Sequence, residues 1–196
     1  MITGIVLAAG RSKRMGGYIK ALMPVHGVSF LERIINSMSS VKVDEILVVL
    51  GYRHREIEKA VNLNDAQFVI NGEWRKGQLS SLRAGVQRLS PGSGGIIFTP
   101  VDHPLVEVST YEELIDTWRH DEGRIVIPTY RGRKGHPALF PERIFGKILH
   151  EKLPGGARDI IYQERDRTVF LPVDDPGVVY DIDTPDDYKR LIGELP

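Results

Sequence analysis

Short apolar runs that alternate with amphipathic helical patterns restrict the fold of this chain more than any other feature. Five such runs are rich in β-branched residues and have the length of buried strands, at positions 5–7, 46–50, 68–70, 96–98 and 125–127. Apolar residues at helical spacing occupy three further segments, at positions 31–38, 111–118 and 188–195. This alternation predicts a mostly parallel sheet covered by helices on both faces.

The rest of the pattern predicts three more short strands, at 138–140, 168–171 and 178–180. Ser109 with Glu112 predicts a helix that starts in a capping box, and Thr184 before Pro185 predicts another helix start. The sequence has no solenoid-type repeat and no segment that resembles a linker. With 196 residues, we expect a single domain over 1–196 with a Rossmann-like three-layer α/β/α architecture.

Charge and cysteine content exclude several classes of function. Lys plus Arg and Asp plus Glu both number 26, so no net field favours nucleic acid or an anionic membrane. The absence of cysteine excludes disulfides, thiolate metal sites and a cysteine nucleophile. The apolar start is too short for a signal sequence, and no later run approaches membrane-spanning length. We therefore expect a soluble, cytoplasmic protein that binds neither nucleic acid nor membranes.

The first apolar run leads into a loop of small and basic residues. Ala8, Ala9 and Gly10 let backbone N–H groups approach a polyphosphate, and the basic residues of the loop can neutralise its charge. These basic residues are Arg11, Lys13, Arg14 and Lys20. A phosphate-binding loop is one interpretation, and a surface turn with solvated cations is the alternative.

Two common glycine-rich motifs do not fit this loop. The dinucleotide fingerprint requires Gly-x-Gly-x-x-Gly, but Gly10 is followed by Arg11 and Ser12. A P-loop requires four residues between its glycines and a lysine after the second, whereas five residues separate Gly10 from Gly16. The loop belongs to neither class.

Asp102 follows the apolar run at 96–98 and stands between Pro100 and Pro104. The prolines stiffen this turn, so the carboxylate can serve as a ligand of Mg²⁺, which prefers carboxylate and phosphate oxygens. The alternative is a turn aspartate that accepts hydrogen bonds from its own backbone.

Two other segments carry polar groups that suit a ligand. Gln78, Ser80 and Ser81 stand at a predicted helix opening, where they could meet an anion or simply cap the helix. His136 follows a cationic stretch and, taken alone, is more typical of a structural histidine. With no second His or Cys at metal-ligand spacing, zinc is not expected.

Taken together, these segments resemble the MobA-like nucleotidyltransferases, and more closely their MocA-like molybdenum cofactor cytidylyltransferase branch. The resemblance spans nearly the whole chain and rests on five motifs in the order of that family. They are Leu7-Ala8-Ala9-Gly10-x-Ser12-x-Arg14-Met15-Gly16 with Lys20, Gly77-Gln78-x-Ser80-Ser81-Leu82-Arg83-Ala84-Gly85, Pro100-x-Asp102-x-Pro104, Gly135-His136-Pro137 and Asp181-Ile182-Asp183-Thr184-Pro185.

The resemblance implies a fold of the nucleotide-diphospho-sugar transferase type and a role for each motif. It implies Arg14, Lys20 and Asp102 as catalytic residues, and Gly135, His136 and Pro137 as contacts to the acceptor. It implies Asp102 and Asp183 as ligands of Mg²⁺, or of Mn²⁺ in its place, with Asp181 structural. The implied nucleotide-binding residues are Leu7, Ala8, Ala9, Gly10, Arg11, Ser12, Arg14, Gly16, Lys20, Gln78, Ser80, Ser81 and Asp102.

The function implied by the resemblance is transfer of CMP from CTP to the terminal phosphate of molybdopterin, with release of pyrophosphate. Ala9, where the guanylyl branch carries glycine, favours CTP over GTP. A molybdenum hydroxylase would receive the product. The alternatives are guanylyl transfer, transfer to a sugar or polyol phosphate, and a non-catalytic module that delivers cofactor. A nicotinamide-dependent oxidoreductase is disfavoured by the missing fingerprint.

The chain departs from the family pattern at two places. Gly155 or Gly156 stands where an Asp is usual, and the opening loop has one extra residue and lacks the Pro-Lys that many members carry. Lys20 is nevertheless expected to reach the phosphates.

Overall fold

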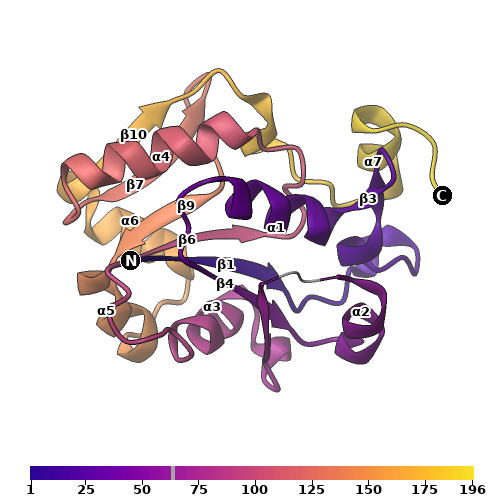
Figure 1. Ribbon diagram of the computed structural model, residues 1–196, viewed down its shortest axis with the longest axis horizontal. Helices are drawn as coiled ribbons and strands as arrows, with labels where there is room; N and C mark the ends of the chain where they lie inside the picture. Colours follow the sequence, from indigo (N-terminus) through magenta and orange to yellow (C-terminus); the bar gives the residue numbers. More distant parts are fainter. Residues whose placement is uncertain (63–64) are drawn as a thin grey trace.

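An eight-stranded sheet forms the centre of the structure, a computed structural model that describes residues 1–62 and 65–196 (Figure 1). Its strands lie in the order β10-β7-β9-β6-β1-β4-β5, and β8 pairs with β7. The strands are β1 (Ile2–Ala8), β4 (Glu45–Leu50), β5 (Gln67–Ile70), β6 (Gly95–Pro100), β7 (Ile125–Tyr130), β8 (Arg133–Lys134), β9 (Ala138–Pro141) and β10 (Thr168–Pro172). Seven of the eight strands predicted from the sequence are confirmed. A separate hairpin joins β2 (Pro24–Val25) and β3 (Val28–Ser29).

The sheet is mixed but mostly parallel, as predicted. Strands β6, β1, β4 and β5 form a parallel block, and β10 runs parallel to β7. Strand β9 inserts between β6 and β7 and is antiparallel to both. Because β1, β4 and β6 are parallel, the segments that follow them leave the sheet at one edge, where ligands bind in such folds.

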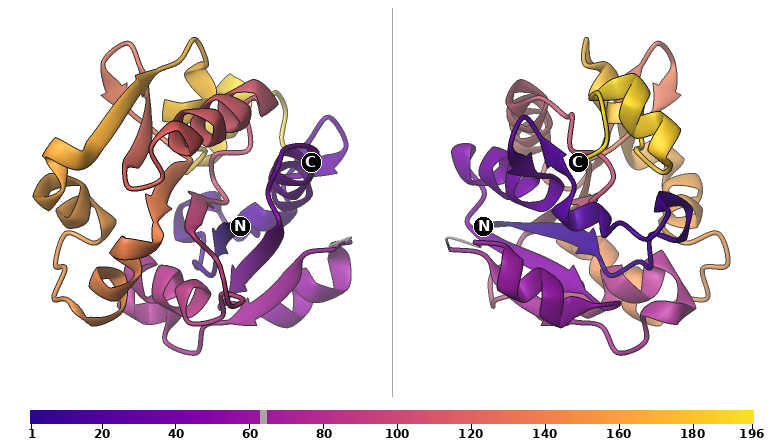
Figure 2. Two further views of the ribbon diagram at one scale, coloured as in Figure 1. Left: turned by 60° about the vertical axis from the view of Figure 1, so that its left-hand side comes forward. Right: turned by 90° about the vertical axis from the view of Figure 1, so that its right-hand side faces the viewer.

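Helices cover both faces of the sheet (Figures 1 and 2). Helices α1 and α4 pack against each other on one face, while α3, α5 and α6 lie on the other. Strand β1 contributes to both cores, because Val6 faces the first and Ile5 the second. The helices are α1 (Phe30–Ser40), α2 (His54–Ala60), α3 (Gln78–Val86), α4 (Val108–His120), α5 (Phe145–His150), α6 (Ala157–Gln163) and α7 (Pro185–Leu191). Within the described residues, no helix combines the length and apolar character needed to cross a membrane.

Helix α3 lies unusually close to β1. A Cβ atom at Gly85 would approach Cγ2 of Ile5 to 2.9 Å, so glycine allows this contact. The contact holds the last turn of α3 against the middle of β1.

Two local predictions are wrong. Residues 178–180 do not form a strand: a 3-10 turn covers Pro176–Val179 instead, capped by the side chain of Asp175. Helix α4 begins at Val108 rather than at a Ser109–Glu112 capping box. Asp175 explains this difference as well, because its carboxylate accepts hydrogen bonds from Glu107 N and Thr110 Oγ1 and so takes the place of a local cap.

Candidate active site

The loop after β1 curls around a cavity of about 560 Å³, which we call the loop cavity. Ser12 takes a left-handed conformation (φ 52°) and its Oγ accepts a hydrogen bond of 3.4 Å from Lys20 N, which ties both ends of the loop together. The walls are Gly10, Arg11, Ser12, Lys13, Arg14, Lys20, Trp74, Arg75 and Asp183. Five predicted nucleotide-binding residues therefore line one space. Ala8 and Ala9 are buried behind it, and Gly16 lies outside its walls.

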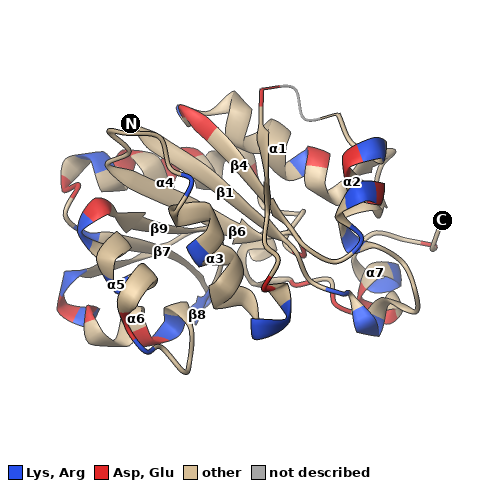
Figure 3. Cartoon of the chain, turned by 90° about the horizontal axis from the view of Figure 1, so that it is seen from below, with Lys and Arg blue, Asp and Glu red and all other residues tan. Residues whose placement is uncertain are grey.

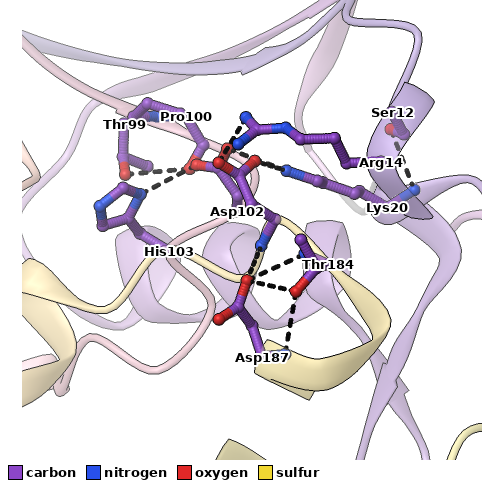
Figure 4. A network of polar contacts seen from close by, with 10 residues as sticks. Ser12, Arg14, Lys20, Thr99, Pro100, Asp102, His103, Thr184 and Asp187 are labelled. Carbon is purple, nitrogen blue, oxygen red and sulfur yellow. Dashed lines mark hydrogen bonds and ion pairs between the residues drawn. The ribbon is translucent and has the colours of Figure 1, made fainter. Parts of the chain in front are cut away.

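Lys20 contacts both predicted metal ligands, and Figure 4 shows its side chain pointing toward Asp102. Its Nζ lies 3.3 Å from Asp102 Oδ2 and also donates to Asp183 Oδ1. Arg14 forms an ion pair with the other oxygen of Asp183. The Lys20 side chain is only 9 % exposed, whereas that of Arg14 is 69 % exposed. Asp102 and Asp183, 81 positions apart in the chain, thus converge on one buried ammonium.

Backbone contacts bring Asp183 to this place. Ile182 N donates to the carbonyl of Asp102 over 2.9 Å, which aligns the two segments. Immediately afterwards, Thr184 and Asp187 form a capping box that starts α7, which confirms the helix start predicted at Thr184. Asp187 also accepts from Asp183 N, so the capping box of α7 fixes the backbone that carries the Asp183 carboxylate.

His103 is a site residue that the sequence interpretation missed. Its Nδ1 lies 2.9 Å from Asp102 Oδ1. Burial raises the pKa of Asp102, but the hydrogen bond and charge of His103, aided by Lys20, outweigh burial and hold that pKa well below its usual value. Its position directly after Asp102, inside the Pro-x-Asp-x-Pro motif, was the signal that could have identified it.

The ring of His103 meets the ring of His136 edge to face, with centroids 4.9 Å apart. Burial, followed by the charge of His103, lowers the pKa of His136 to about 3, so this imidazole is neutral at physiological pH. The backbone holds it firmly: His136 N donates to Val178 O over 2.8 Å. A Cβ atom on the neighbouring Gly135 would collide with that carbonyl. His136 therefore contributes shape rather than charge.

Gly135 and His136 line a second and larger cavity of about 1120 Å³, which we call the large cavity; Pro137 is not among its walls. Its apolar walls include Leu7, Leu82, Phe98 and Ile127, which all belong to the core on the α3 face of the sheet. Basic side chains at Lys76, Lys134, Arg158 and Arg165 also line it. Figure 3 shows β8, which carries Lys134, on the side of the molecule where α3 and α6 lie. The carboxylates of Asp159 and Asp181 line it too, so the cavity combines apolar surface with four basic and two acidic side chains.

Helix α3 contributes to the large cavity through its first residues. Gly77, Gln78 and Leu79 line the cavity. Ser80 and Ser81 do not: both hydroxyls accept hydrogen bonds from Asn71 Nδ2, and the two serines join the start of α3 to the end of β5. This geometry favours a structural role for them. Their side chains do not cap the helix, since Gly77 is its N-cap.

The segment from Leu153 to Arg158 also lines the large cavity. Asp159 reaches back to the Gly155-Gly156 pair, one of which stands where an Asp was expected from the family pattern, and its carboxylate accepts from Gly155 N over 2.8 Å. A side chain on Gly155 would collide with this carboxylate. A carboxylate from the first turn of α6 therefore lies beside the glycine pair where the Asp is missing.

The donor atoms around Lys20 suit a hard cation. Asp102 and Asp183 offer carboxylate oxygens, the ligand type that Mg²⁺ and Mn²⁺ prefer, and Mg²⁺ usually completes its shell with substrate phosphates and water. In the described part of the chain, no cluster of three or more His, Cys, Asp or Glu forms a complete protein cage. The residues therefore fit a metal that binds together with a phosphate ligand.

An α/β sheet that ends in a basic, glycine-containing loop beside paired carboxylates defines a nucleotide-binding protein of the transferase type. Residues 4–178 match the MobA-like NTP transferase domain, and the chain belongs to that family. This confirms the family predicted from the five motifs.

Relatives of known name cover nearly the entire chain. Nicotine blue oxidoreductase from Paenarthrobacter nicotinovorans is 28 % identical over 199 residues, covering 97 % of this chain and 96 % of the relative. Purine catabolism protein PucB from Bacillus subtilis is 26 % identical over 204 residues, covering 97 % and 95 %.

Solved structures agree with the fold. A nucleotidyl transferase from Methanothermobacter (Mth528) superposes with a TM-score of 0.85 at 26 % identity and covers 98 % of this chain and 96 % of that one. Rv0371c from Mycobacterium tuberculosis in complex with manganese has a TM-score of 0.76 at 27 % identity, with 97 % of both chains covered.

Proposed function

We propose that this protein transfers CMP from CTP to the terminal phosphate of molybdopterin and releases pyrophosphate. The observation that carries the proposal is the cluster of Lys20, Asp102 and Asp183, which borders the loop cavity directly and the large cavity through His103. Lys20 and Asp183 line the loop cavity, and His103, bound to Asp102, lines the large cavity. A nucleotide bound in the loop cavity and an acceptor phosphate bound in the large cavity would meet at these charged side chains.

Each part of the site has a task that nucleotidyl transfer requires. Such transfer depends on positioning and charge neutralisation rather than on a protein nucleophile. The loop from Gly10 to Arg14 would hold the triphosphate, and Arg14 and Lys20 would offset its charge and that of the leaving pyrophosphate. Mg²⁺ or Mn²⁺ held by Asp102 and Asp183 would supply Lewis-acid polarisation of a phosphoryl oxygen. The acceptor phosphate is already ionised near neutral pH, so no general base is required.

The walls of the large cavity support an acceptor that joins an apolar ring system to a phosphate. Phe98 and Leu82 offer apolar contact, and Lys134 and Arg158 offer charge. Because His136 is neutral, we assign the phosphate to these cations rather than to the imidazole, which changes the contact expected from the sequence.

The choice of CTP rests on the motifs, chiefly on Ala9. The MocA-like branch is supported in addition by relatives that cover 97 % of the chain. Ala9 is 3 % exposed and its carbonyl accepts from Tyr52 N, so its methyl group would act on the base through the position of the loop. The manganese complex of a similar structure supports the divalent ion. A molybdenum hydroxylase as recipient, a cytoplasmic location and a single domain over 1–196 stay predictions.

The decisive experiment measures pyrophosphate release with each of CTP, GTP, ATP and UTP, with and without molybdopterin. We expect release that depends on molybdopterin, with kcat/KM for CTP at least about tenfold above that for GTP. Better use of GTP would replace the cytidylyl assignment by a guanylyl one. Release that needs a sugar or polyol phosphate instead would identify another acceptor.

A second candidate function is an oxidoreductase, because nicotine blue oxidoreductase is similar over nearly the whole chain. The dinucleotide fingerprint is absent from the described β1 loop, which does not favour this activity. Titration of the protein with NADH and NADPH separates the two candidates. Bound or oxidised cofactor would support the oxidoreductase, and an unchanged absorbance spectrum would dismiss it.

A further inference from the structure

The cations assigned to the triphosphate already bind the carboxylates assigned to the metal. Lys20 contacts both Asp102 and Asp183, and Arg14 occupies the second oxygen of Asp183. Two positive side chains therefore balance two negative ones. The same four groups cannot hold these contacts and also bind a metal and a triphosphate in full.

Burial makes the competition strong. Side chains of Lys20, Asp183 and Asp102 are 9 %, 18 % and 24 % exposed, so water screens their charges only in part. A divalent cation placed on the carboxylates would lie beside the Lys20 ammonium and be repelled. Removing the ammonium from the carboxylates without a substitute anion would leave a buried charge unpaired.

A triphosphate resolves both problems at once. Lys20 and Arg14 line the loop cavity, so phosphate oxygens there would replace Asp102 and Asp183 as their partners. The released carboxylates would then be free to bind a cation.

We propose that Lys20 and Arg14 form a latch that keeps the divalent metal out until the nucleotide binds. The nucleotide opens the latch, so metal and nucleotide bind synergistically, and each raises the affinity for the other by the same factor. This inference deepens the proposed function and rests on its assignment of the triphosphate to the loop cavity.

Binding of Mn²⁺, followed by the loss of its free EPR signal, tests the latch without turnover. Without nucleotide, we expect Lys20→Met to bind Mn²⁺ at least about tenfold more tightly than the parent. Arg14→Met should also bind it more tightly, by a smaller factor, and because Arg14 is 69 % exposed this variant is expected to fold. Lys147→Met is the matched control: Lys147 and Arg143 likewise pair with one carboxylate, Glu164, and its removal should leave Mn²⁺ affinity unchanged.

The second arm adds α,β-methylene-CTP or α,β-methylene-GTP, which resist transfer. The reference is an Asp102→Asn, Asp183→Asn double variant with the same analogue, which reports Mn²⁺ held by the nucleotide alone. With either analogue, we expect the Mn²⁺ affinity of the parent to be at least about tenfold higher than that of this reference. The gain should be smaller in Lys20→Met, where the latch is already open.

Equal Mn²⁺ affinity of the parent and both latch variants without nucleotide would overturn the proposal, as would a parent that binds Mn²⁺ equally tightly with and without the analogues. Failure of the proposed function is distinct from either result. It would show as absent pyrophosphate release, whatever the Mn²⁺ affinities.

Discussion

At the scale of single residues, the negative charge of Asp102 serves two neighbours at once. Its two oxygens contact Lys20 and His103, and the depressed pKa keeps the carboxylate ionised. Asp102 can therefore order both the loop cavity and the large cavity, which a turn aspartate bound only to its own backbone could not do.

Replacing Asp102 with Asn should show how much of this depends on charge. The amide keeps the size but cannot hold a divalent cation, so kcat should fall by about two to three orders of magnitude, an electrostatic loss of about 3 to 4 kcal/mol. Pyrophosphate release at saturating substrate measures it, with Asp116→Asn on the exposed face of α4 as control. A kcat of Asp102→Asn within a few-fold of the parent value would exclude Asp102 as a metal ligand.

Lys20 and Arg14 should differ from surface cations. If they clamp phosphates, Lys20→Ala and Arg14→Ala should each lower kcat/KM at least about tenfold, because a charge-assisted contact to the triphosphate is lost. Lys59→Ala and Lys147→Ala, away from both cavities, should stay near the parent value. Similar losses in all four variants would contradict the phosphate-binding loop.

His136 should make stability depend on pH. Its pKa is about 3 in the folded protein, whereas a free imidazole titrates near pH 6.5, so between these values only the unfolded chain takes up the proton. This contribution to stability is fully present above about pH 6.5 and is lost as the pH falls toward 3.

Urea unfolding at pH 7.5 and pH 5 measures the effect. Between pH 7.5 and pH 5, the free energy of unfolding of the parent should fall by up to about 2 kcal/mol more than that of His136→Gln. His120→Gln, at the exposed end of α4, is the control and should lose as much as the parent. An equal loss in parent and His136→Gln would show that this imidazole is not kept neutral by the fold.

At the scale of elements, the start of α7 fixes the backbone of Asp183, the proposed metal ligand. Thr184→Ala removes the side-chain cap and should destabilise the protein by about 0.5 to 2 kcal/mol. It should also lower kcat, because Asp187 loses the hydrogen bond from the Thr184 hydroxyl, keeps at residue 184 only that from the backbone N, and then fixes the Asp183 backbone less firmly. Thermal unfolding and pyrophosphate release measure the two effects.

The capping box of α1 gives a matched control for this change. Ser29 and Glu32 form the same arrangement, so Ser29→Ala should cost similar stability while kcat changes less. A proportional loss of kcat in both variants would mean that the effect of Thr184 is general destabilisation.

At the scale of the whole molecule, the large cavity exists because distant segments cross beside β7. Gly135 N donates to Pro128 O, and the neighbouring His136 N donates to Val178 O. These contacts pack the Gly135-His136-Pro137 segment against the 3-10 turn at Pro176–Val179, leaving no room for a Cβ at Gly135.

Gly135→Ala should therefore reshape the acceptor side while sparing the donor side. We expect the KM for the acceptor to rise at least about tenfold and the KM for the nucleotide to stay within about twofold. Gly146→Ala is the control, because a Cβ there meets open space. Equal increases in both KM values would argue against separate donor and acceptor cavities.

Much of the fold could be predicted because its signals are local. Apolar runs and helical spacing identified seven of the sheet strands, α1, α4 and the capped start of α7, although α7 ends at Leu191, before the last apolar positions of its pattern. The strand predicted at 178–180 is absent because this prediction used local signals alone. Its apolar side chains suggested a strand, but Pro176 and the Asp175 cap impose a 3-10 turn. The local pattern of apolar residues does not reveal which side chain from a distant part of the chain will hydrogen-bond to a backbone N–H or C=O group.

The sequence by itself determined the family, the alternating architecture and the loop and carboxylates offered at one edge of the sheet, since these depend on neighbouring residues and on motifs in fixed order. Only the tertiary structure decided that Lys20 pairs with Asp183 across 163 positions, that His103 meets His136, and that Ser81 turns to Asn71. The physical reason is that charges and hydrogen bonds act through space. Their partners are set by strand order and by helix packing, and neither is written in the spacing of residues along the chain.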